Sequence, residues 1–189
     1  MNPKKQPSVS TLLAIALLAP VANYTAAQEP HTHDAHTNAV AAGATYAGQQ
    51  TRVIKALSLQ ETQDLLDGKG LGLAKAAELN GYPGPMHTLE HADAMKLTSE
   101  QRDQTRVLLA KHKEAVSALG RQLVGAEKAL DMGFSEKRMT TGRLTAMTDD
   151  IGRLQALIRA EHLRTHLEQT ALLSSSQVER YRALRGYIN

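Results

Sequence analysis

The strongest constraint on the fold is a pair of long apolar stripes that repeat with the period of an α-helix. Between residues 99 and about 132, two sets of residues each recur every seven positions: Leu109, Val116, Leu123 and Leu130, with His112, Leu119 and Ala126 between them. Between about 140 and 172 the stripe comprises Leu144, Met147, Ile151, Leu154 and Ile158, and it continues toward His162. Such spacing places side chains on one helical face. It predicts two helices of more than thirty residues each, joined as an antiparallel hairpin by a break at residues 132–135.

Two similar stretches of five residues stand at the two ends of this predicted hairpin: Leu97-Thr98-Ser99-Glu100-Gln101 and Leu173-Ser174-Ser175-Ser176-Gln177. Each has the form of a helix start. The hydroxyl of the N-cap residue, Thr98 or Ser174, accepts a backbone N–H of the first turn, and the glutamine at N3, Gln101 or Gln177, accepts the N–H of the N-cap residue. Because the hairpin is antiparallel, both stretches are expected to lie together at its base.

The remaining periodic segments are short and helical. Capping and turn residues predict helices over 59–66, 73–79, 86–95 and 177–185. The chain has no Cys, no Trp and one Phe, so its core must consist of aliphatic side chains and methionine. The prediction is an all-α fold, a long antiparallel helical hairpin with additional short helices. A hairpin of this length cannot cover its own apolar face, which favours a homodimer.

The N-terminal residues have the composition of an export signal. Lys4 and Lys5 precede an apolar run at 12–19 and a small-residue site at 25–27, which predicts a signal peptide over 1–27 and export of the chain. The signal does not distinguish a cell with one membrane from a cell with two, and the overall composition favours a periplasmic location. Residues 28–56 are expected to form a flexible arm that contains histidines, and 57–189 a helical domain. No segment is long enough to span a membrane. Beyond residue 27 the chain has 20 basic and 19 acidic side chains, which gives no support to nucleic-acid binding.

Histidine spacing suggests a second property. His87 with His91, and His162 with His166, are four residues apart, which places two imidazoles on one helical face and would suit Zn, Cu or Ni. The arm adds three more possible ligands: His31, His33 and His36. Two ligands do not complete a zinc site, so the alternative is that the pairs are half-buried or surface residues.

The segment His87-Thr88-Leu89-Glu90-His91 also matches the His-x-x-Glu-His pattern of one class of zinc proteases. In that chemistry Glu90 would activate a metal-bound water, and a distant carboxylate such as Glu168 would be the third ligand. The chain offers no strands for a substrate-binding sheet. The glycine-rich residues 68–72 follow a helix and lack the spacing of a phosphate-binding loop. The prediction is that the protein is not an enzyme and requires no cofactor.

The exported, helical, cysteine-free chain with paired Leu-[Thr/Ser]-x-x-Gln stretches resembles the Spy/CpxP group of periplasmic proteins. The resemblance covers roughly residues 86–187, and Ser174 departs mildly from the threonine of the motif. It implies a cradle-like homodimer that acts without ATP, as a chaperone or stress-response protein. The partners implied are unfolded or misfolded envelope proteins or a sensor-kinase domain. The same group includes heavy-metal sensor and resistance proteins, which is the alternative function.

Overall fold

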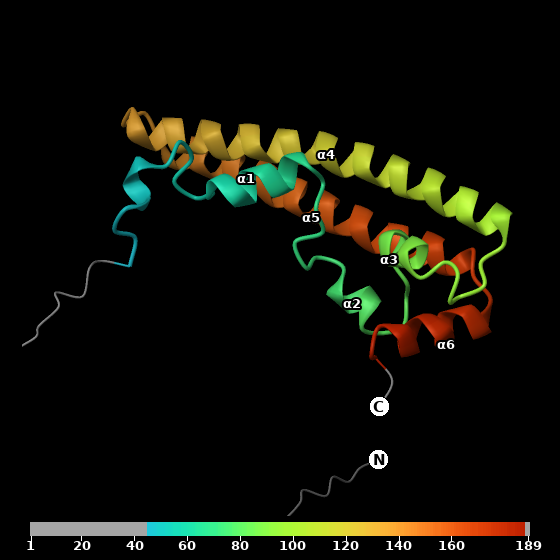
Figure 1. The fold of residues 1–189 in the computed structure, drawn as a ribbon. Coiled ribbons are helices and arrows are strands. Elements are labelled where there is room, and N and C mark those ends of the chain that lie inside the picture. The colour runs from blue at the N-terminus through green and yellow to red at the C-terminus, as the bar shows by residue number, and fades with distance from the viewer. Residues whose placement is uncertain (1–44, 188–189) are drawn as a thin grey trace, which may run out of the picture. The chain divides into compact units, whose positions relative to one another are not determined.

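The computed structural model describes residues 45–187 and confirms the all-α prediction, because every regular element in this range is helical. Figure 1 shows the elements: a short 3-10 helix η1 (Gln49–Thr51), α1 (Leu59–Leu66), α2 (Lys75–Glu78), α3 (Pro85–Glu90), α4 (Ser99–Ser135), α5 (Thr141–Ala171) and α6 (Ser175–Leu184). None of the helices in this range is both long enough and apolar enough to cross a membrane. The predicted signal peptide and His31, His33 and His36 lie outside the described residues.

The two long helices α4 and α5 form the predicted antiparallel hairpin, but the break between them lies later than expected. Gly133 is buried inside α4 and does not end it. The helix ends in a Schellman arrangement, in which Arg138 N–H donates to the Gly133 carbonyl and Lys137 N–H to the Phe134 carbonyl. Lys137 takes the left-handed conformation, with φ of 54°, that glycine usually supplies. The predicted position of the break was wrong because no glycine occupies the true end of the helix.

The predicted stripes meet in the core of the hairpin. Val116 and Leu123 from α4 pack against the buried Ile151, Leu154 and Ile158 from α5. Full burial of each such side chain contributes on the order of 1.5–3 kcal/mol to folding. These contacts account for the period of the two stripes.

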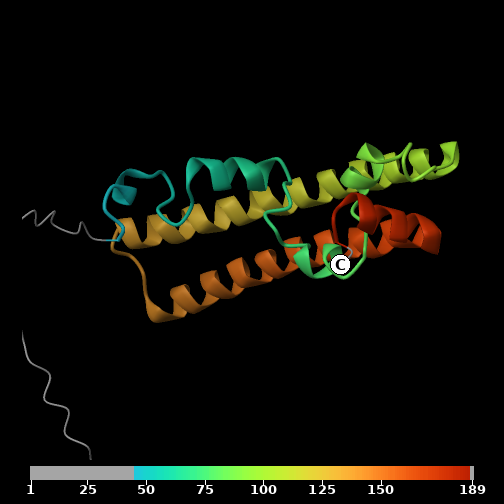
Figure 2. The same ribbon diagram turned by 60° about the horizontal axis from the view of Figure 1, so that its bottom comes forward.

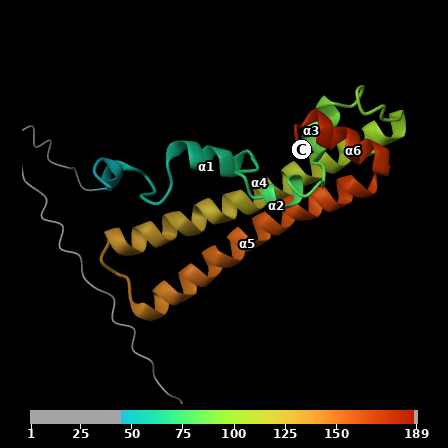
Figure 3. The same ribbon diagram turned by 90° about the horizontal axis from the view of Figure 1, so that it is seen from below.

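Helix α1 contributes Leu65 to this core and approaches α4 closely. The approach depends on Gly120, because a Cβ atom there would overlap the carbonyl oxygen of Leu65. Figure 2 shows α1 along α4, and α2 beside α5. The short helices α1, α3 and α6 lie on one side of the hairpin, and no helix of residues 45–187 lies on the other side (Figure 3).

At the base of the hairpin, the two capping stretches lock together. Thr98 and Ser174 both form complete capping boxes with Gln101 and Gln177. In addition, the two glutamines bond to each other, since each Nε2 donates to the other's Oε1 at 2.9 Å. The exchange is nearly symmetric: Gln101 Nε2 also donates to the carbonyl of Leu172, and Gln177 Nε2 to that of Lys96. Leu172 directly precedes Leu173, the first residue of the second stretch, and Lys96 directly precedes Leu97, the first residue of the first stretch.

Three short helices differ in extent from the sequence prediction. Helix α2 is shorter than 73–79, and α6 begins two residues before 177. Helix α3 ends at Glu90 instead of continuing to residue 95. Beyond it the chain turns, with Lys96 at a φ of 54° and Leu97 N–H donating to the Ala92 carbonyl. The turn lets Ala92 and Met95 pack against buried Tyr181 in a second apolar cluster, and this tertiary contact overrides the local helical pattern.

The last part of the predicted arm is packed. Ile54 is buried, and Asp131 of α4 accepts both the backbone N–H of Lys55, at 3.2 Å, and its Nζ, at 3.0 Å. The packed region therefore begins before residue 57, where the predicted arm was to end.

Candidate functional site

A cavity of about 650 Å³ lies beside the hairpin, between the glycine-rich residues 67–72, helices α2 and α3, and the facing sides of α4 and α5. Four histidines contribute to its walls: His87 from α3, His112 from α4, and His162 and His166 from α5. Glu78, the last residue of α2, also lines it. The volume lies within the range of pockets that bind small organic ligands.

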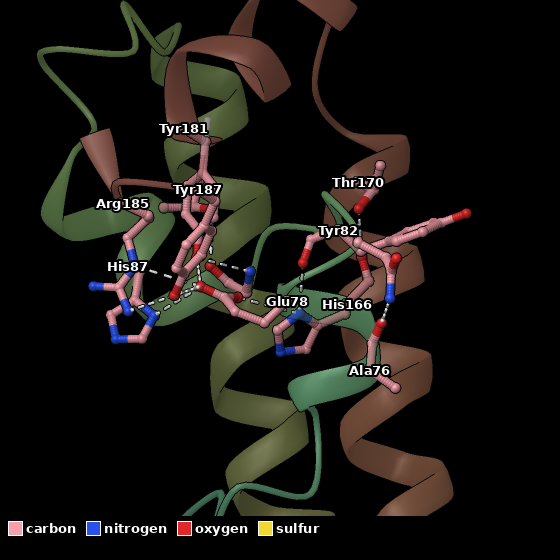
Figure 4. A network of polar contacts seen from close by, with 12 residues as sticks. Ala76, Glu78, Tyr82, His87, His166, Thr170, Tyr181, Arg185 and Tyr187 are labelled. Atoms are coloured by element: carbon pink, nitrogen blue, oxygen red, sulfur yellow. Dashed lines mark hydrogen bonds and ion pairs between the residues drawn. The ribbon is translucent and has the colours of Figure 1, made fainter. Parts of the chain in front are cut away.

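Glu78 is the centre of the polar network shown in Figure 4. Its Oε1 accepts a hydrogen bond of 2.6 Å from the hydroxyl of Tyr181 and one of 3.2 Å from Tyr187, and it lies 3.4 Å from Arg185 Nε. Tyr181 is fully buried, and burial together with the bond to Glu78 raises the pKa of its hydroxyl. Tyr181 is therefore a permanent donor that fixes the carboxylate. Helix α6 supplies both Tyr181 and the chain reversal that brings Tyr187 alongside it.

Two histidines flank the same carboxylate. His87 Nδ1 lies 3.8 Å from Glu78 Oε1, and His166 Nδ1 lies 3.7 Å from Oε2. His166 is held more firmly, because its Nδ1 donates a 2.7 Å hydrogen bond to the carbonyl of Tyr82. Gly84 makes room for the imidazole, since a Cβ atom there would lie 2.9 Å from the ring. The rigid Tyr82-Pro83-Gly84-Pro85 turn thus positions His166.

The other two histidines form a pair across the hairpin. The rings of His112 and His162 meet edge to face with centroids 4.7 Å apart. His112 Nδ1 lies 2.9 Å from Thr165 Oγ1, whose hydroxyl donates to the Glu161 carbonyl; the imidazole is therefore the donor in this bond. Burial, with a smaller effect of neighbouring histidines, lowers the pKa of His162 to about 4, and burial also lowers the pKa of His112. Both rings are neutral at pH 7.

A polar seam continues from this pair to the base of the hairpin. Gln169, fully buried in α5, donates from Nε2 to Thr105 Oγ1 at 3.2 Å, and Thr105 donates to the carbonyl of Gln101. The hairpin interface is therefore apolar toward the α4–α5 connection and polar toward the base. Buried polar groups need partners, so this half of the interface permits fewer alternative registers.

The predicted metal ligands are brought together only in part. His87, His162 and His166 all line the cavity, but His91, which caps α3, does not. The two side chains of the pair in α5 have different surroundings, since His162 packs against His112, whereas His166 bonds to Tyr82. Among residues 45–187, no group of three or more His, Asp or Glu side chains is arranged to hold a metal ion. Glu90 and Glu168, the candidates for protease chemistry, are exposed. Metal binding stays a prediction.

Sequence reasoning missed several residues of the site. His112 occupies a stripe position, and its period signalled burial but not a histidine partner 50 residues later. Glu78, Tyr181 and Tyr187 carry no motif at all, because their contact joins α2 to the C-terminal helix. In comparisons with protein-family models, curated proteins and solved structures, no match to this chain was found.

Proposed function

We propose that this protein is an exported, non-enzymatic binding protein of the Spy/CpxP type that holds unfolded or misfolded envelope proteins without ATP. The observation that carries the proposal is the uncovered side of the hairpin (Figure 3). Two long helices leave this side without a covering helix of the described residues, and both have apolar side chains that are substantially exposed: Val107, Met132, Phe134, Leu157 and Leu167.

The charge pattern of the hairpin suits weak, unselective binding. Exposed basic residues accompany the apolar ones along both helices: Arg106, Lys111, Lys113, Arg121, Lys128, Arg143, Arg153, Arg159 and Arg164. Exposed apolar area attracts the apolar segments of a non-native chain, and basic side chains attract its carboxylates. Methionine adapts to clients of different shape because its side chain is flexible and polarisable.

The interlocked capping stretches give further support. Their mutual glutamine bonds explain why a chain of this kind would keep a Leu-[Thr/Ser]-x-x-Gln pattern twice, at the two ends of one hairpin. The pattern has a structural role at the base and leaves the long helices free to bind. A sensor-kinase domain is the alternative partner, since it could use the same uncovered side.

Suppression of aggregation tests the proposal. The purified protein is mixed with a chemically unfolded client without nucleotide, and light scattering is followed. We expect suppression near equimolar ratios, and weaker suppression by the double variant Leu157→Ser/Leu167→Ser. Both positions are exposed, so the fold should tolerate the changes.

The matched control is Leu59→Ser, which removes an equally apolar side chain, 83% exposed, from α1 on the covered side. It should suppress aggregation as the unmodified protein does. The sedimentation mass of each variant is measured in parallel to separate loss of a client surface from a change of assembly. An absence of suppression by the unmodified protein would leave only the sensor-kinase partner.

Heavy-metal sensing by the histidines is the second candidate. Its support is that three of the predicted ligands, His87, His162 and His166, line one cavity together with His112. Equilibrium titration with Zn, Cu and Ni tests it, with His162→Ala/His166→Ala as the comparison. If the unmodified protein has no micromolar affinity for any of these ions, the metal function is excluded.

A further inference from the structure

We propose that the cavity beside the hairpin is a binding site for a neutral aromatic molecule of two or three rings that carries a hydroxyl or N–H donor. Nothing in the proposed client binding requires such a site. The proposal is built on the size of the cavity, its apolar walls and two imidazole acceptors, on the buried His112 and the half-buried His166, which define its inner end.

The walls suit a flat apolar ligand. The volume of about 650 Å³ exceeds what a single ring needs. The side chains that contribute apolar surface come from three separate stretches of the chain: Leu71 and Ala74, Pro85 and Met86, and Leu109. A rigid aromatic ring buries a large area at a small entropic cost, and methionine sulfur makes favourable contacts with aromatic rings.

The glycine-rich residues, for which no phosphate chemistry could be assigned, form one wall. Gly68 and Gly72 have φ of 66° and 75°, and Leu71 between them has φ of 46°. Three of the five residues 68–72 thus have the left-handed conformation, and the chain turns tightly there. The backbone of these residues itself lines the cavity. Leu71, which belongs to this wall, is 47% exposed. A ligand in the cavity would cover part of this apolar side chain.

The inner end is rich in acceptors. His112 gives its Nδ1 proton to Thr165, and His166 gives its Nδ1 proton to the Tyr82 carbonyl. In the neutral form, each imidazole therefore presents a lone pair at Nε2. The only hydrogen bonds of these two rings to described residues are those at Nδ1, and both histidines line the cavity. The buried Nε2 of His162, a third histidine of the wall, also has no partner among the described residues. A ligand donor would satisfy one or both of these nitrogens.

The charges of the site favour a neutral ligand. The Glu78 carboxylate and the two Nε2 lone pairs disfavour an anion at the inner end. A cation would be repelled by Arg185, which lies 3.4 Å from Glu78 Oε1, and by Lys75 and Lys113 in the walls. Glu78 Oε2, buried without a hydrogen-bond partner among the described residues, is a further acceptor that a neutral donor can satisfy. A phenolic hydroxyl or a ring N–H supplies the donor without adding a charge.

Two matched probes test this inference, 2-naphthol and its methyl ether, 2-methoxynaphthalene, which lacks the donor. The chain has no Trp, so naphthalene emission can be followed against a low protein background. We expect saturable binding of naphthol, at least about tenfold tighter than binding of the ether, as one satisfied buried hydrogen bond warrants. Equal affinities for the two probes, or no saturation by naphthol below about 1 mM, would overturn the proposal.

Variants locate the site. His112→Leu removes one acceptor while Thr165 keeps its bond to Glu161, and it should weaken naphthol binding. The double variant His112→Leu/His166→Leu removes both acceptors and should bring the affinity for naphthol close to that for the ether. His91→Gln changes a histidine that does not line the cavity and should leave both affinities unchanged. Thermal unfolding monitors the fold of each variant. If His91→Gln lowered naphthol affinity as much as His112→Leu, the assignment to this cavity would be wrong.

Nitrogen NMR of the histidine rings makes the test independent of any variant. On the unmodified protein, naphthol should shift the Nε2 resonances of His112 or His166 in the direction of an accepted hydrogen bond, and the ether should not. Unchanged Nε2 resonances at naphthol saturation would contradict the proposal. A negative outcome here leaves client binding intact, because that function depends on the other side of the hairpin.

Discussion

At the scale of single residues, the paired imidazoles of His112 and His162 are the most consequential feature of the hairpin. An apolar pair at the same two positions would pack without polar atoms, but this pair leaves His162 Nε2 buried without a hydrogen-bond partner among residues 45–187. An unsatisfied polar atom of this kind costs on the order of 1–3 kcal/mol of folding free energy. The histidines therefore weaken the hairpin locally, beside the cavity, and they make its stability depend on pH.

The first prediction concerns this pH dependence. The folded-state pKa of His162 is about 4, below the unfolded value near 6.5, so the unfolded chain binds the proton more readily. Stability is therefore full above pH 6.5 and is lost as the pH falls toward 4. Lowering the pH from 7 to 5 should remove about 2 kcal/mol of unfolding free energy through this group. Urea unfolding at the two pH values measures the loss.

The variant His162→Leu provides the comparison, because it removes this proton-binding site and the orphaned nitrogen together. Its unfolding free energy should fall less between pH 7 and pH 5 than that of the unmodified protein. The pKa of His112 is lowered in the same direction, so a smaller dependence should persist in the variant. An identical pH dependence in both proteins would show that His162 is not the responsible group.

At the scale of elements, the fold depends on close contacts that fix how helices meet. The capping stretches start α4 and α6 and also join them, so one set of residues sets both the helix boundaries and the helix arrangement. Helix α1 meets α4 through a glycine, and α3 ends early to let Met95 reach Tyr181. In each case, one side chain, or the lack of a side chain at a glycine, determines how closely two helices approach each other.

The second prediction concerns the glutamine pair. Gln101→Ala and Gln177→Ala should each destabilise the protein by roughly 1–2 kcal/mol, because each removes a cap bond and the mutual bonds. The double variant should lose less than the sum of the two, by about 1 kcal/mol, since the mutual bonds can be lost only once. Chemical unfolding of the four proteins gives this coupling energy.

The exposed Gln104 of α4, which bonds only to Glu100 of its own helix, is the control position. Gln104→Ala should change stability by less than about 0.5 kcal/mol and should be additive with Gln177→Ala. Strict additivity of Gln101→Ala with Gln177→Ala would contradict the interlocked base.

The third prediction concerns Gly120. Alanine is the better helix former by about 1 kcal/mol, but at this position its Cβ would overlap the carbonyl oxygen of Leu65 and push α1 away from α4. We expect Gly120→Ala to cost roughly 1–3 kcal/mol of stability. The same change at Gly125, in the same helix but with nothing within 4 Å of the new atom, should stabilise the protein instead. Thermal unfolding of the two variants separates the steric clash with Leu65 from the helix propensity of alanine. A shift of the unfolding temperature in the same direction in both variants would exclude the steric effect.

At the scale of the whole molecule, the described residues form two apolar clusters, one along the hairpin and one at its base around Tyr181. The cavity with its histidines lies between the helices that supply these clusters. The short helices α1, α3 and α6 lie on one side of α4 and α5, and both long helices have exposed apolar side chains. The two proposed roles, client binding and ligand binding, would therefore use separate parts of the molecule.

The fourth prediction concerns assembly. A homodimer is expected because the hairpin leaves one side uncovered, and pairing of two copies would bury part of its apolar surface. Sedimentation equilibrium at micromolar concentration should give twice the chain mass. A mass equal to one chain over the whole concentration range would remove the homodimer and, with it, a cradle made of two chains.

The sequence by itself determined the features that depend on near neighbours. The apolar stripes, the capping boxes at Thr98 and Ser174, and the number of long helices all follow from residues within four or seven positions of each other. Helix periodicity and capping are local physics, so they can be read from the chain. The end of the long helix α4 was predicted wrongly, because Lys137 takes a conformation that its side chain does not favour.

Only the tertiary structure decided what the residues of the candidate site contact. Thr165 and His112 are separated by 53 positions, Gln101 and Gln177 by 76, and Glu78 and Tyr181 by 103. Helix spacing shows which face a residue occupies, but it does not give the residue that lies opposite when two helices pack. The register between α4 and α5, and the return of α6 to α2, determine those partners. For that reason the histidine pairs at i,i+4 were visible in the sequence, whereas the cavity that three of those four histidines share with His112 and Glu78 was not.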